Sequence, residues 1–420
     1  MKHQLVIVRL IFGLTFIFSG FVKLIDPVGT GLVIQEYLNI IHFDFLSFMR
    51  VFIGVSLSLL EFLVGVAILM RMRMREASVL ALLMTIFFTV VTLLLLIFEP
   101  IQDCGCFGEA ASLTHGETFF KNIILLICVI PIFLQRKSFR RDSSVFAEWL
   151  FISIYGLIAL GFSIVSYVRM PVVEFTDFKV GTDIAVELSD AAEGRNFETM
   201  FVYEKDGVKQ EFSLDNLPDT TWNFVESVDV SDASDDAPFE FYVTNSQGQY
   251  VTDTLITLDT PIMICNIYDL DEFYSDENWM KVNMLKERVE SEGGELWLLV
   301  ASTPEETKSV LGADVEERFE VGYTDYKTAI AVHRSNGGFL YINSAFIVKK
   351  WSRQGLSPED DLSVLSKDFD EVMIYDVIKQ QLIYEISIVV LLASIAVIRY
   401  FCKMVSLKRM RMLRAESSKL

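Results

Sequence analysis

Asp103-Cys104-Gly105-Cys106-Phe107-Gly108 is a short polar stretch between two long apolar segments. It contains two of the five cysteines of the chain, separated by a single glycine. Because glycine permits a tight backbone bend, the two sulfurs can come within bonding range of each other. A disulfide in so small a ring is strained and easily reduced, so the pattern favours thiol–disulfide exchange over stabilisation of the fold.

The composition predicts a membrane part joined to an acidic soluble part. The chain is 52% hydrophobic, yet its net charge is −20. Residues 171–380 contain 43 acidic and 16 basic side chains, a net charge of −27. This acidic balance argues against nucleic acid as a partner, because phosphate binding needs clustered Lys and Arg.

Six segments are long and apolar enough to cross a bilayer core of about 30 Å, which takes about 20 residues of helix. The first is read as a membrane helix and not as a signal peptide, because its apolar run is long and no cleavage site of small residues follows it. The six predicted spans are Gln4–Leu24, Met49–Met70, Ala77–Phe98, Phe119–Leu134, Trp149–Val168 and Leu382–Cys402.

Basic residues gather in three places that lie on one side of a six-span topology, and such loops stay in the cytoplasm. They are Arg71, Arg73 and Arg75; Arg136, Lys137, Arg140 and Arg141; and Lys403, Lys408, Arg409, Arg411 and Arg414. We therefore expect a bacterial inner-membrane protein with both termini in the cytoplasm. The Cys104 loop and the acidic part would lie in the oxidising periplasm. Cys128 and Cys402 fall in spans four and six, where we expect apolar packing.

The acidic part has two patterns. Residues 171–258 contain short alternating runs, such as Thr199–Tyr203 and Phe239–Val243, separated by turn-like pieces that include Ser246-Gln-Gly248. These predict a small antiparallel β section. Residues 259–378 change to strand, helix, strand, helix and hairpin, an order typical of a thioredoxin-like α/β domain. The predicted elements there are Ile262–Tyr268, Glu277–Glu290, Leu296–Ala301, Pro304–Leu311, Phe339–Ile342 and Ala345–Val348.

Phe18-Ser-Gly20, Lys23-Leu-Ile-Asp-Pro27, Glu61 and the Cys104 loop together resemble the DoxX/MauE family of four-helix membrane proteins over residues 1–135. The resemblance implies a four-helix bundle with a redox role in the bacterial envelope. MauE-type members are associated with disulfide formation in a periplasmic enzyme. The bundle is also similar to DsbB and vitamin K epoxide reductase, which carry more cysteines and pass electrons between thiols and a quinone. A quinone is accordingly the candidate cofactor.

The predicted fold is thus a membrane α-helical protein, with the DoxX-like four-helix bundle, two further transmembrane helices, a periplasmic β section and an α/β thioredoxin-like domain. Its parts are the bundle (1–135), a basic cytoplasmic loop with the fifth helix (136–170), the β section (171–258), the thioredoxin-like domain (259–378), the sixth helix (379–402) and a basic cytoplasmic tail (403–420).

Glu61 lies in the middle of span two, where an ionisable group is costly unless it is paired or faces a polar cavity. One reading pairs it with Arg9 on span one. The other makes it a proton relay, or part of a quinone-sized pocket together with Arg9 and Lys23. Lys23 and Asp26 could complete a polar cluster under the Cys104 loop, although snorkelling also explains Lys23.

His115 follows Cys106 by nine residues and is a candidate base for a thiol proton, unless it is an ordinary surface histidine. Cys104 and Cys106 are then the candidate exchange pair, or else a static clamp. We expect no metal site, because the loop offers two thiols and no well-spaced further ligands.

The thioredoxin-like domain departs from a working thioredoxin. Tyr268–Tyr274 has no cysteine where a C-x-x-C would open the helix, and His333–Phe339 lacks the expected proline. Cys265 is read as a buried strand residue. The domain is expected to be redox-inactive and to offer an acidic binding surface for basic clients.

Two functions remain open. One is a thiol–disulfide oxidoreductase that exchanges with periplasmic proteins through the C-x-C loop and is coupled to quinone. The other is a non-catalytic assembly or scaffold subunit of a larger membrane complex, whose periplasmic domain binds a partner.

Overall fold

The computed structural model describes residues 2–98, 105–111, 113–139, 144–171, 173–194, 199–205, 208–212, 223–229, 239–258, 260–360 and 362–383, with single positions at 385, 386, 389, 390, 393, 397, 400 and 404. Cys104 and Cys402 lie outside these residues. So do most of the sixth predicted span and of the tail that follows it.

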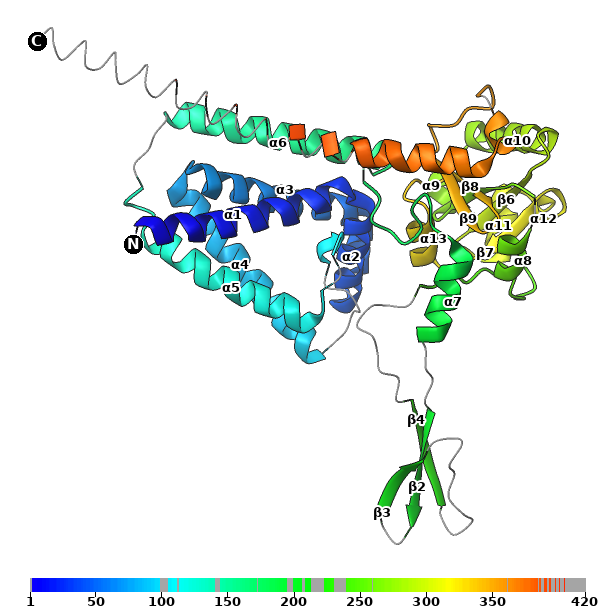
Figure 1. Ribbon diagram of the computed structural model, residues 1–420, viewed down its shortest axis with the longest axis horizontal. Helices are drawn as coiled ribbons and strands as arrows, with labels where there is room; N and C mark the ends of the chain where they lie inside the picture. Colours follow the sequence, from blue (N-terminus) through cyan, green and yellow to red (C-terminus); the bar gives the residue numbers. More distant parts are fainter. Residues whose placement is uncertain are drawn as a thin grey trace, which may run out of the picture.

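Five helices of the described chain are long and apolar enough to cross a membrane, which makes this a membrane protein. They are α1 (Lys2–Ile25), α3 (Arg50–Met70), α4 (Met74–Phe98), α5 (His115–Leu134) and α6 (Val145–Val168). They confirm the first five predicted spans. α1 packs on α3, α3 on α4, α4 on α5 and α5 on α1, while α6 packs against α1 and α3 (Figure 1).

Glycines set the register between α1 and α3. A Cβ on Gly20 would lie 2.6 Å from the backbone nitrogen of Phe62, and one on Gly65 would lie 2.7 Å from that of Ile17. Real Cβ atoms do not approach backbone atoms so closely, so only glycine allows this contact. The two antiparallel helices are therefore held at one depth relative to each other, with Gly13 close to Leu69.

A further helix, α2 (Pro27–Ile40), follows α1 and lies across the ends of the membrane helices (Figure 1). Asp26 caps it, accepting a hydrogen bond from the Gly29 backbone N–H at 2.9 Å, and Pro27 occupies the first helical position. Both are common features of helix starts. A 3₁₀ helix, η1 (Asp44–Met49), then leads into α3.

The C-terminal region contains a mixed five-stranded sheet with the order β7-β6-β5-β8-β9. Its strands are β5 (Ile262–Ile267), β6 (Glu295–Val300), β7 (Glu320–Tyr323), β8 (Gly338–Asn343) and β9 (Phe346–Trp351). β5, β6 and β7 are parallel, and β8 runs antiparallel to both β5 and β9. Four of these strands confirm the predictions, whereas β7 was not expected. We call residues 239–365 the sheet domain.

Helices cover both faces of this sheet, so its central strand is apolar on both sides. Met263, Cys265 and Ile267 of β5 face one core, and Ile262 and Ile264 face the other. The helices are α8 (Thr252–Thr257), α9 (Leu270–Phe273), α10 (Asp276–Ser291), α11 (Pro304–Leu311), α12 (Val315–Arg318) and α13 (Tyr326–Val332), with a short η3 (Ser363–Leu365). α10 and α11 confirm the predicted helices. The helix over 369–383 follows.

The chain that leaves α6 is fastened to the edge strand β9. The Gly181 N–H donates to the Ile347 carbonyl at 2.8 Å, and the Ile347 N–H donates to the Thr182 carbonyl at 2.9 Å. Glu174 forms a buried ion pair with Lys350 of β9. α7 (Ile184–Gly194) begins directly after this segment.

A separate three-stranded antiparallel sheet follows α7, with β2 (Thr199–Lys205) between β3 (Val208–Phe212) and β4 (Asn223–Asp229). The strand predicted at Thr199–Tyr203 is confirmed. The one predicted at Phe239–Val243 is wrong, since no regular strand forms there. Phe241 and Val243 are instead buried in the sheet domain, which explains their alternating apolar pattern.

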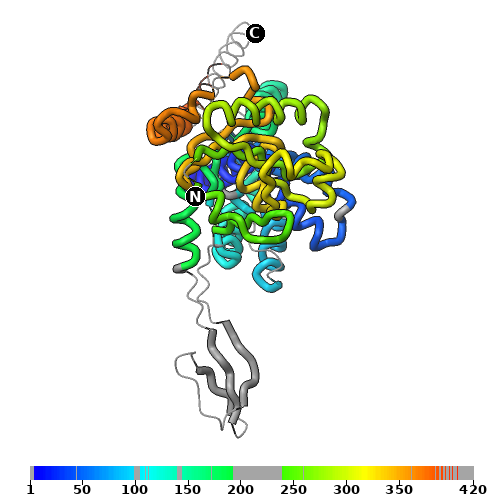
Figure 2. Tube along the Cα trace, turned by 90° about the vertical axis from the view of Figure 1, so that its right-hand side faces the viewer, coloured from blue at the N-terminus to red at the C-terminus, as the bar shows by residue number. Residues whose placement is uncertain are grey.

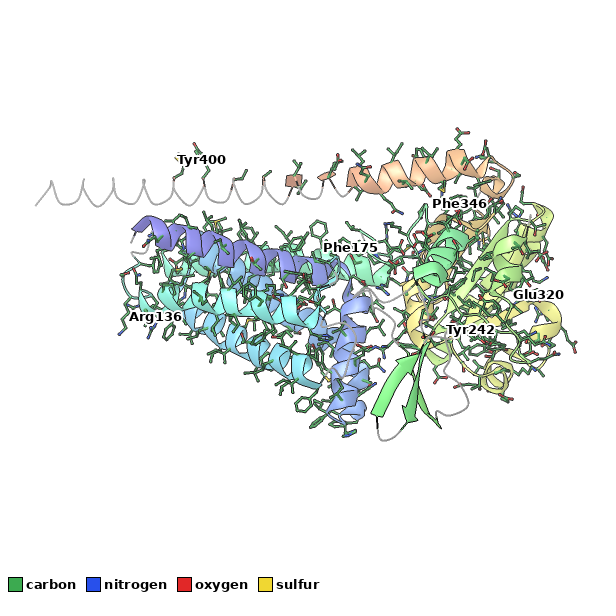
Figure 3. All side chains as sticks on the ribbon, turned by 60° about the horizontal axis from the view of Figure 1, so that its bottom comes forward. Arg136, Phe175, Tyr242, Glu320, Phe346 and Tyr400 are labelled. Atoms are coloured by element: carbon green, nitrogen blue, oxygen red, sulfur yellow. The ribbon has the colours of Figure 1, made fainter. Side chains whose placement is uncertain are left out.

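Seen from the side of the sheet domain, the membrane helices lie behind it (Figure 2). Arg136 lies at the ends of these helices farthest from the sheet domain, where α5 terminates (Figure 3). Arg71 and Arg73 connect α3 to α4 at the same ends.

Candidate functional site

Cys106 opens a short strand, β1 (Cys106–Glu109), that is held against α1. The Ser19 hydroxyl, which is buried, donates to the Cys106 carbonyl at 2.7 Å. The next residue, Phe107, packs edge-on against Phe18 with ring centroids 5.5 Å apart, and the Lys121 ammonium lies 4.2 Å from its ring centroid. The Phe18-Ser19 pair therefore fixes the backbone of the cysteine loop at the end of α1.

Two glycines give the loop its path. Gly105 and Gly108 have φ values of +63° and +57°, which most residues with a Cβ avoid. A Cβ on Gly105 would also lie 2.5 Å from Cγ1 of Val33 on α2. The loop is thus confined between α1 and α2.

Glu61 is paired with Lys23, and both side chains are buried. The Lys23 ammonium also lies 5.8 Å from the Phe88 ring centroid, and its Cγ approaches the Cβ position of Gly108 at 3.8 Å. The pair therefore lies beneath the cysteine loop. Lys23 does not snorkel toward water, because Glu61 holds it in the interior.

The predicted Arg9–Glu61 bridge is wrong. The Arg9 guanidinium donates instead to the carbonyls of Ile68 and Leu69, at 3.2 and 2.8 Å. These carbonyls lie at the C-terminal end of α3, where a cation is favoured. The glycine register explains the change, because Gly13 already faces Leu69 and leaves Arg9 level with the end of α3.

The structure does not bring Arg9 together with Lys23 and Glu61. Arg9 and Lys23 lie fourteen residues apart on one helix, about 21 Å at 1.5 Å per residue. The Glu61 carboxylate is already engaged by Lys23. A quinone held jointly by these three residues does not fit this arrangement.

Asp26 joins the membrane helices to the sheet domain. It accepts a hydrogen bond from Nε of Arg334 at 3.0 Å, and the two side chains are 11% and 1% exposed. Arg334 also donates to the Ile330 carbonyl at 2.9 Å. A Cβ on Gly29 would lie 2.4 Å from Oδ2 of Asp26 and 2.9 Å from a guanidinium nitrogen of Arg334, so the ion pair has closed over that glycine.

Arg334 belongs to the loop His333–Phe339, and its neighbour Asn336 binds the end of β5. The Asn336 side chain accepts hydrogen bonds from the N–H groups of Tyr268 and Asp269 at 3.0 and 3.2 Å, and donates to the Asp269 carbonyl at 2.7 Å. The segment after β5 and the loop before β8 are therefore locked together. They form one surface, and α2 packs on it.

Apolar and polar contacts complete this interface. Val28 of α2 lies in one cluster with Tyr268 and Ile330 of the sheet domain. Tyr326 of α13 accepts a hydrogen bond from Arg50, whose guanidinium carbon also lies 5.4 Å from the ring centroid. Burial raises the pKa of the Tyr326 hydroxyl, so it stays protonated at neutral pH. A second ion pair, between Glu36 and Lys327, lies at the exposed edge.

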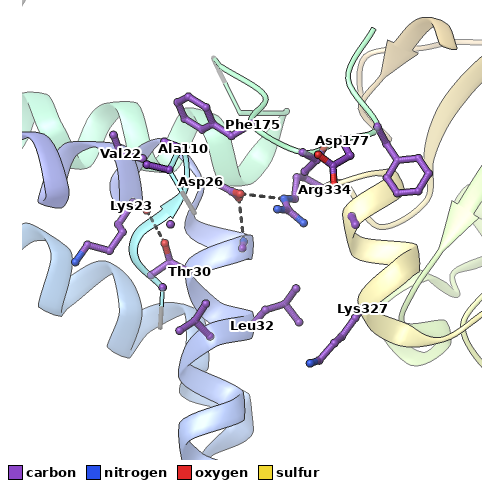
Figure 4. Close-up of a pocket in the computed structure, with 18 of the residues that line it drawn as sticks. Val22, Lys23, Asp26, Thr30, Leu32, Ala110, Phe175, Asp177, Lys327 and Arg334 are labelled. Atoms are coloured by element: carbon purple, nitrogen blue, oxygen red, sulfur yellow. Dashed lines mark hydrogen bonds and ion pairs between the residues drawn. The ribbon is translucent and has the colours of Figure 1, made fainter. Parts of the chain in front are cut away.

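A cavity of about 680 Å³ lies between the cysteine loop, α2 and the sheet domain (Figure 4). Gly105, Gly108 and Lys23 line one side, and Arg334 lines the other. The remaining lining residues come from α1, α2, the loop after β1, the chain after α6, the start of the sheet domain and α13: Val22, Asp26, Gly29, Thr30, Leu32, Val33, Glu36, Ala110, Ala111, Phe175, Thr176, Asp177, Phe178, Phe239, Glu240, Lys327, Thr328 and Ala331.

The other predicted site residues lie elsewhere. His115 is half-buried at the first position of α5, does not line the cavity, and its Nε2 has no hydrogen-bond partner among the described residues. Cys265 is fully buried in β5, as predicted, and burial raises the pKa of its thiol to about 12. Cys128 packs in the core between α1, α4 and α5. Within the described residues, no group of three His, Cys, Asp or Glu side chains could hold a metal ion.

Sequence reasoning missed the role of Arg334, and it missed α2. The Asp26-Pro27 pair was a usable signal for α2, since Asp at a helix cap followed by Pro predicts a helix start. No local pattern marks Arg334, because its partner lies 308 positions away in the sequence.

Comparison with known proteins gives two family matches. Residues 197–231 match a model described only as a domain of unknown function. No curated protein and no solved structure matches the chain. Residues 1–135, which contain α1 to α5, the cysteine loop and the Lys23–Glu61 pair, match the family of the methylamine utilisation protein MauE.

Proposed function

We propose that this membrane protein exchanges disulfides with client thiols through Cys104 and Cys106. The observation that carries the proposal is the anchored loop, because Ser19 and α2 fix Cys106 beside a cavity large enough for a peptide segment. The match of residues 1–135 to the MauE family supports a role in envelope redox maturation.

In the proposed step, a client thiolate attacks one sulfur of the Cys104–Cys106 disulfide, and the other sulfur leaves as a thiolate. A second client thiolate then attacks the mixed disulfide and releases the reduced loop. The client loses two electrons and two protons, and the loop gains them. His115 remains a proposed base.

We further propose that a quinone accepts the two electrons and two protons from the reduced loop. Its binding site would be formed by residues other than the trio Glu61, Arg9 and Lys23, since Arg9 lies at the far end of α1.

The proposed orientation puts the cysteine loop and the sheet domain in the periplasm and both termini in the cytoplasm of a bacterial inner membrane. Arg71, Arg73 and Arg136 lie at the helix ends opposite the sheet domain, as the distribution of positive charge requires.

The sheet domain is proposed to be a redox-inactive thioredoxin-like domain on a DoxX-like bundle. The order β6-β5-β8-β9, with β5 and β6 parallel and β8 and β9 antiparallel, supports this assignment. Asp269 to Glu272 occupy the position where a thioredoxin carries its cysteines. In this proposal the domain positions clients and does not react with them.

A second candidate function is a non-catalytic scaffold. The buried Asp26–Arg334 pair favours it, because the surface formed by the β5 end and the 333–338 loop is already occupied by α2. A client-binding role for that surface is then limited to its uncovered part, beside the cavity.

The redox state of Cys104 and Cys106 in living cells separates the two functions. Free thiols are alkylated before and after quinone reduction is blocked. If exchange occurs, the alkylated fraction of Cys104 and Cys106 should differ between the two conditions. Cys106→Ser would then trap a client through a mixed disulfide at Cys104, while Cys128→Ser serves as the matched control. A pair that stays oxidised under both conditions and traps nothing would overturn the exchange function and leave the scaffold.

A further inference from the structure

We propose that the cavity between α2 and the sheet domain binds an extended, basic segment of a client polypeptide that flanks its reacting cysteine. This inference rests on the proposed exchange function. Its experiment is designed so that binding and exchange can fail separately.

The dimensions of the cavity suit a short peptide. Ligand clefts in proteins commonly enclose about 300–1,000 Å³, and this one encloses about 680 Å³. The side next to the cysteine loop is lined by Gly105, Gly108, Ala110 and Ala111, which carry no side chain beyond Cβ. A client backbone can therefore approach the loop closely, as an attack on a loop sulfur requires.

The opposite wall supplies the contacts that an extended chain needs. Phe175 and Phe239 offer apolar surface, and Thr328 offers a hydroxyl group. These residues come from the chain after α6, the start of the sheet domain and α13. The chain after α6 and the sheet domain thus form the client-facing wall of the cavity, while the membrane helices carry the reactive loop.

The charges of the lining favour a basic occupant. Each cation of the lining is already engaged: Lys23 by Glu61, Arg334 by Asp26 and Lys327 by Glu36. The Asp177 carboxylate is exposed and has no ion-pair partner within the described chain. Glu240 also lines the cavity. Complementary charge raises the rate of encounter and selects among partners.

The same lining argues against a quinone as the occupant. A quinone is a largely apolar ring that prefers an apolar pocket with one or two donors. This cavity instead contains the carboxylates of Asp26, Glu36, Asp177 and Glu240. A quinone in the cavity is accordingly an outcome that would contradict the proposal.

The binding experiment uses the full-length protein in lipid nanodiscs and two fluorescent pentapeptides. Each has a central serine in place of the client cysteine, so that no covalent reaction occurs, and its flanking residues are either lysines or glutamates. We expect the lysine peptide to bind at least about fivefold more tightly, and its affinity to fall with added salt. Equal binding of the two peptides would overturn the inference.

Matched variants locate the binding. Asp177→Asn should weaken binding of the lysine peptide by about three- to tenfold, whereas Asp190→Asn, an exposed carboxylate on α7, should leave it unchanged. Thr328→Trp should fill the cavity and abolish binding, whereas Thr254→Trp on the exposed side of α8 should not. If Thr328→Trp fails to fold, Asp177→Asn decides alone, because it is an exposed change of the same size.

Two further experiments distinguish peptide binding from quinone binding and from disulfide exchange. Displacement of the lysine peptide by a short-chain ubiquinone would assign the cavity to a quinone and overturn the inference. The second experiment uses peptides that carry cysteine in place of the serine. If a mixed disulfide forms regardless of the flanking charge, the exchange function is supported and the inference is overturned. Charge-selective binding without any mixed disulfide would support the inference and contradict the exchange function.

Discussion

Arg334 of the sheet domain and Asp26 at the start of α2 form an ion pair, 3.0 Å from Nε to Oδ2, that is almost completely shielded from water. The two residues lie 308 positions apart in the sequence, and their contact fixes the sheet domain over the cysteine loop. Both residues line the cavity, so their pair joins its two walls.

Breaking this pair should loosen the docking of the sheet domain. Removal of one partner from a buried ion pair costs about 3–5 kcal/mol, because the other charge stays buried and unpaired. Arg334→Ala is therefore expected to increase hydrogen exchange in the amides of α2 and α13. Lys327→Ala is the control, since Lys327 is 67% exposed and its pair with Glu36 is worth about 0–1 kcal/mol. Equal effects of the two variants would contradict this account.

The Lys23–Glu61 pair should show strong coupling in a double-mutant cycle. Lys23→Met and Glu61→Leu each leave one buried charge and are expected to lower the thermal midpoint of the purified protein. The double variant should recover much of that loss, because both charges are then absent. The surface pair Arg73–Glu76, whose carboxylate side chain is 45% exposed, provides the comparison and should couple weakly. Additive losses at Lys23 and Glu61 would show that the pair does not form.

Gly20→Ala should destabilise the packing of α1 on α3. The added methyl group would lie 2.6 Å from the Phe62 nitrogen and 2.7 Å from the Ser58 carbonyl oxygen, so the helices must separate. Gly161→Ala on α6 is the matched control, because no atom lies within 4 Å of its Cβ position. It should be neutral, or stabilise the helix by about 1 kcal/mol through higher helix propensity. Thermal unfolding of both variants in the same detergent tests the difference.

His333 makes the sheet domain sensitive to acid. Burial and the nearby Lys350 lower the pKa of His333 to about 3. Its unfolded pKa is about 6.5, so between these values the unfolded chain binds a proton that the folded chain does not. Stability should thus fall as the pH drops below about 6.5, with a slope approaching about 1.4 kcal/mol per pH unit from this group.

The test is the difference in pH dependence between the native protein and His333→Gln, measured by thermal unfolding from pH 7 to pH 5. The variant should lose this part of the slope, whatever its stability at pH 7. His42→Asn is the control, because His42 is exposed and Asn tolerates its positive φ. Parallel curves for native protein and His333→Gln would contradict a buried, neutral His333.

The membrane helices and most strands could be predicted because their signals are local. Twenty apolar residues in a row fix a span, and the apolar runs of β5 and β6 fix buried parallel strands. Phe239–Val243 shows the limit of such reasoning. Its alternating pattern is real, but Phe241 and Val243 are buried without a partner strand, which periodicity cannot distinguish from a strand.

The candidate site depended on distant contacts, and so it was only partly predictable. Lys23, Glu61 and Asp26 could be selected because charges near membrane helices are costly. Their partners could not, since Gly20 and Gly65 decide which residues of α1 and α3 are level. Arg334 lies in a loop whose importance arises only when the sheet domain meets α2.

Gly29 provides an engineering handle on this arrangement. It lies beneath the Asp26–Arg334 pair with no room for even a methyl group, yet it carries neither charge. A bulky residue at this position would act as a wedge that parts the two halves of the protein while leaving every ionisable group in place. A substitution at Asp26 or Arg334 changes both the docking of the sheet domain and the buried charges. A substitution at Gly29 would change the docking alone, so the two effects could be tested separately in a living cell.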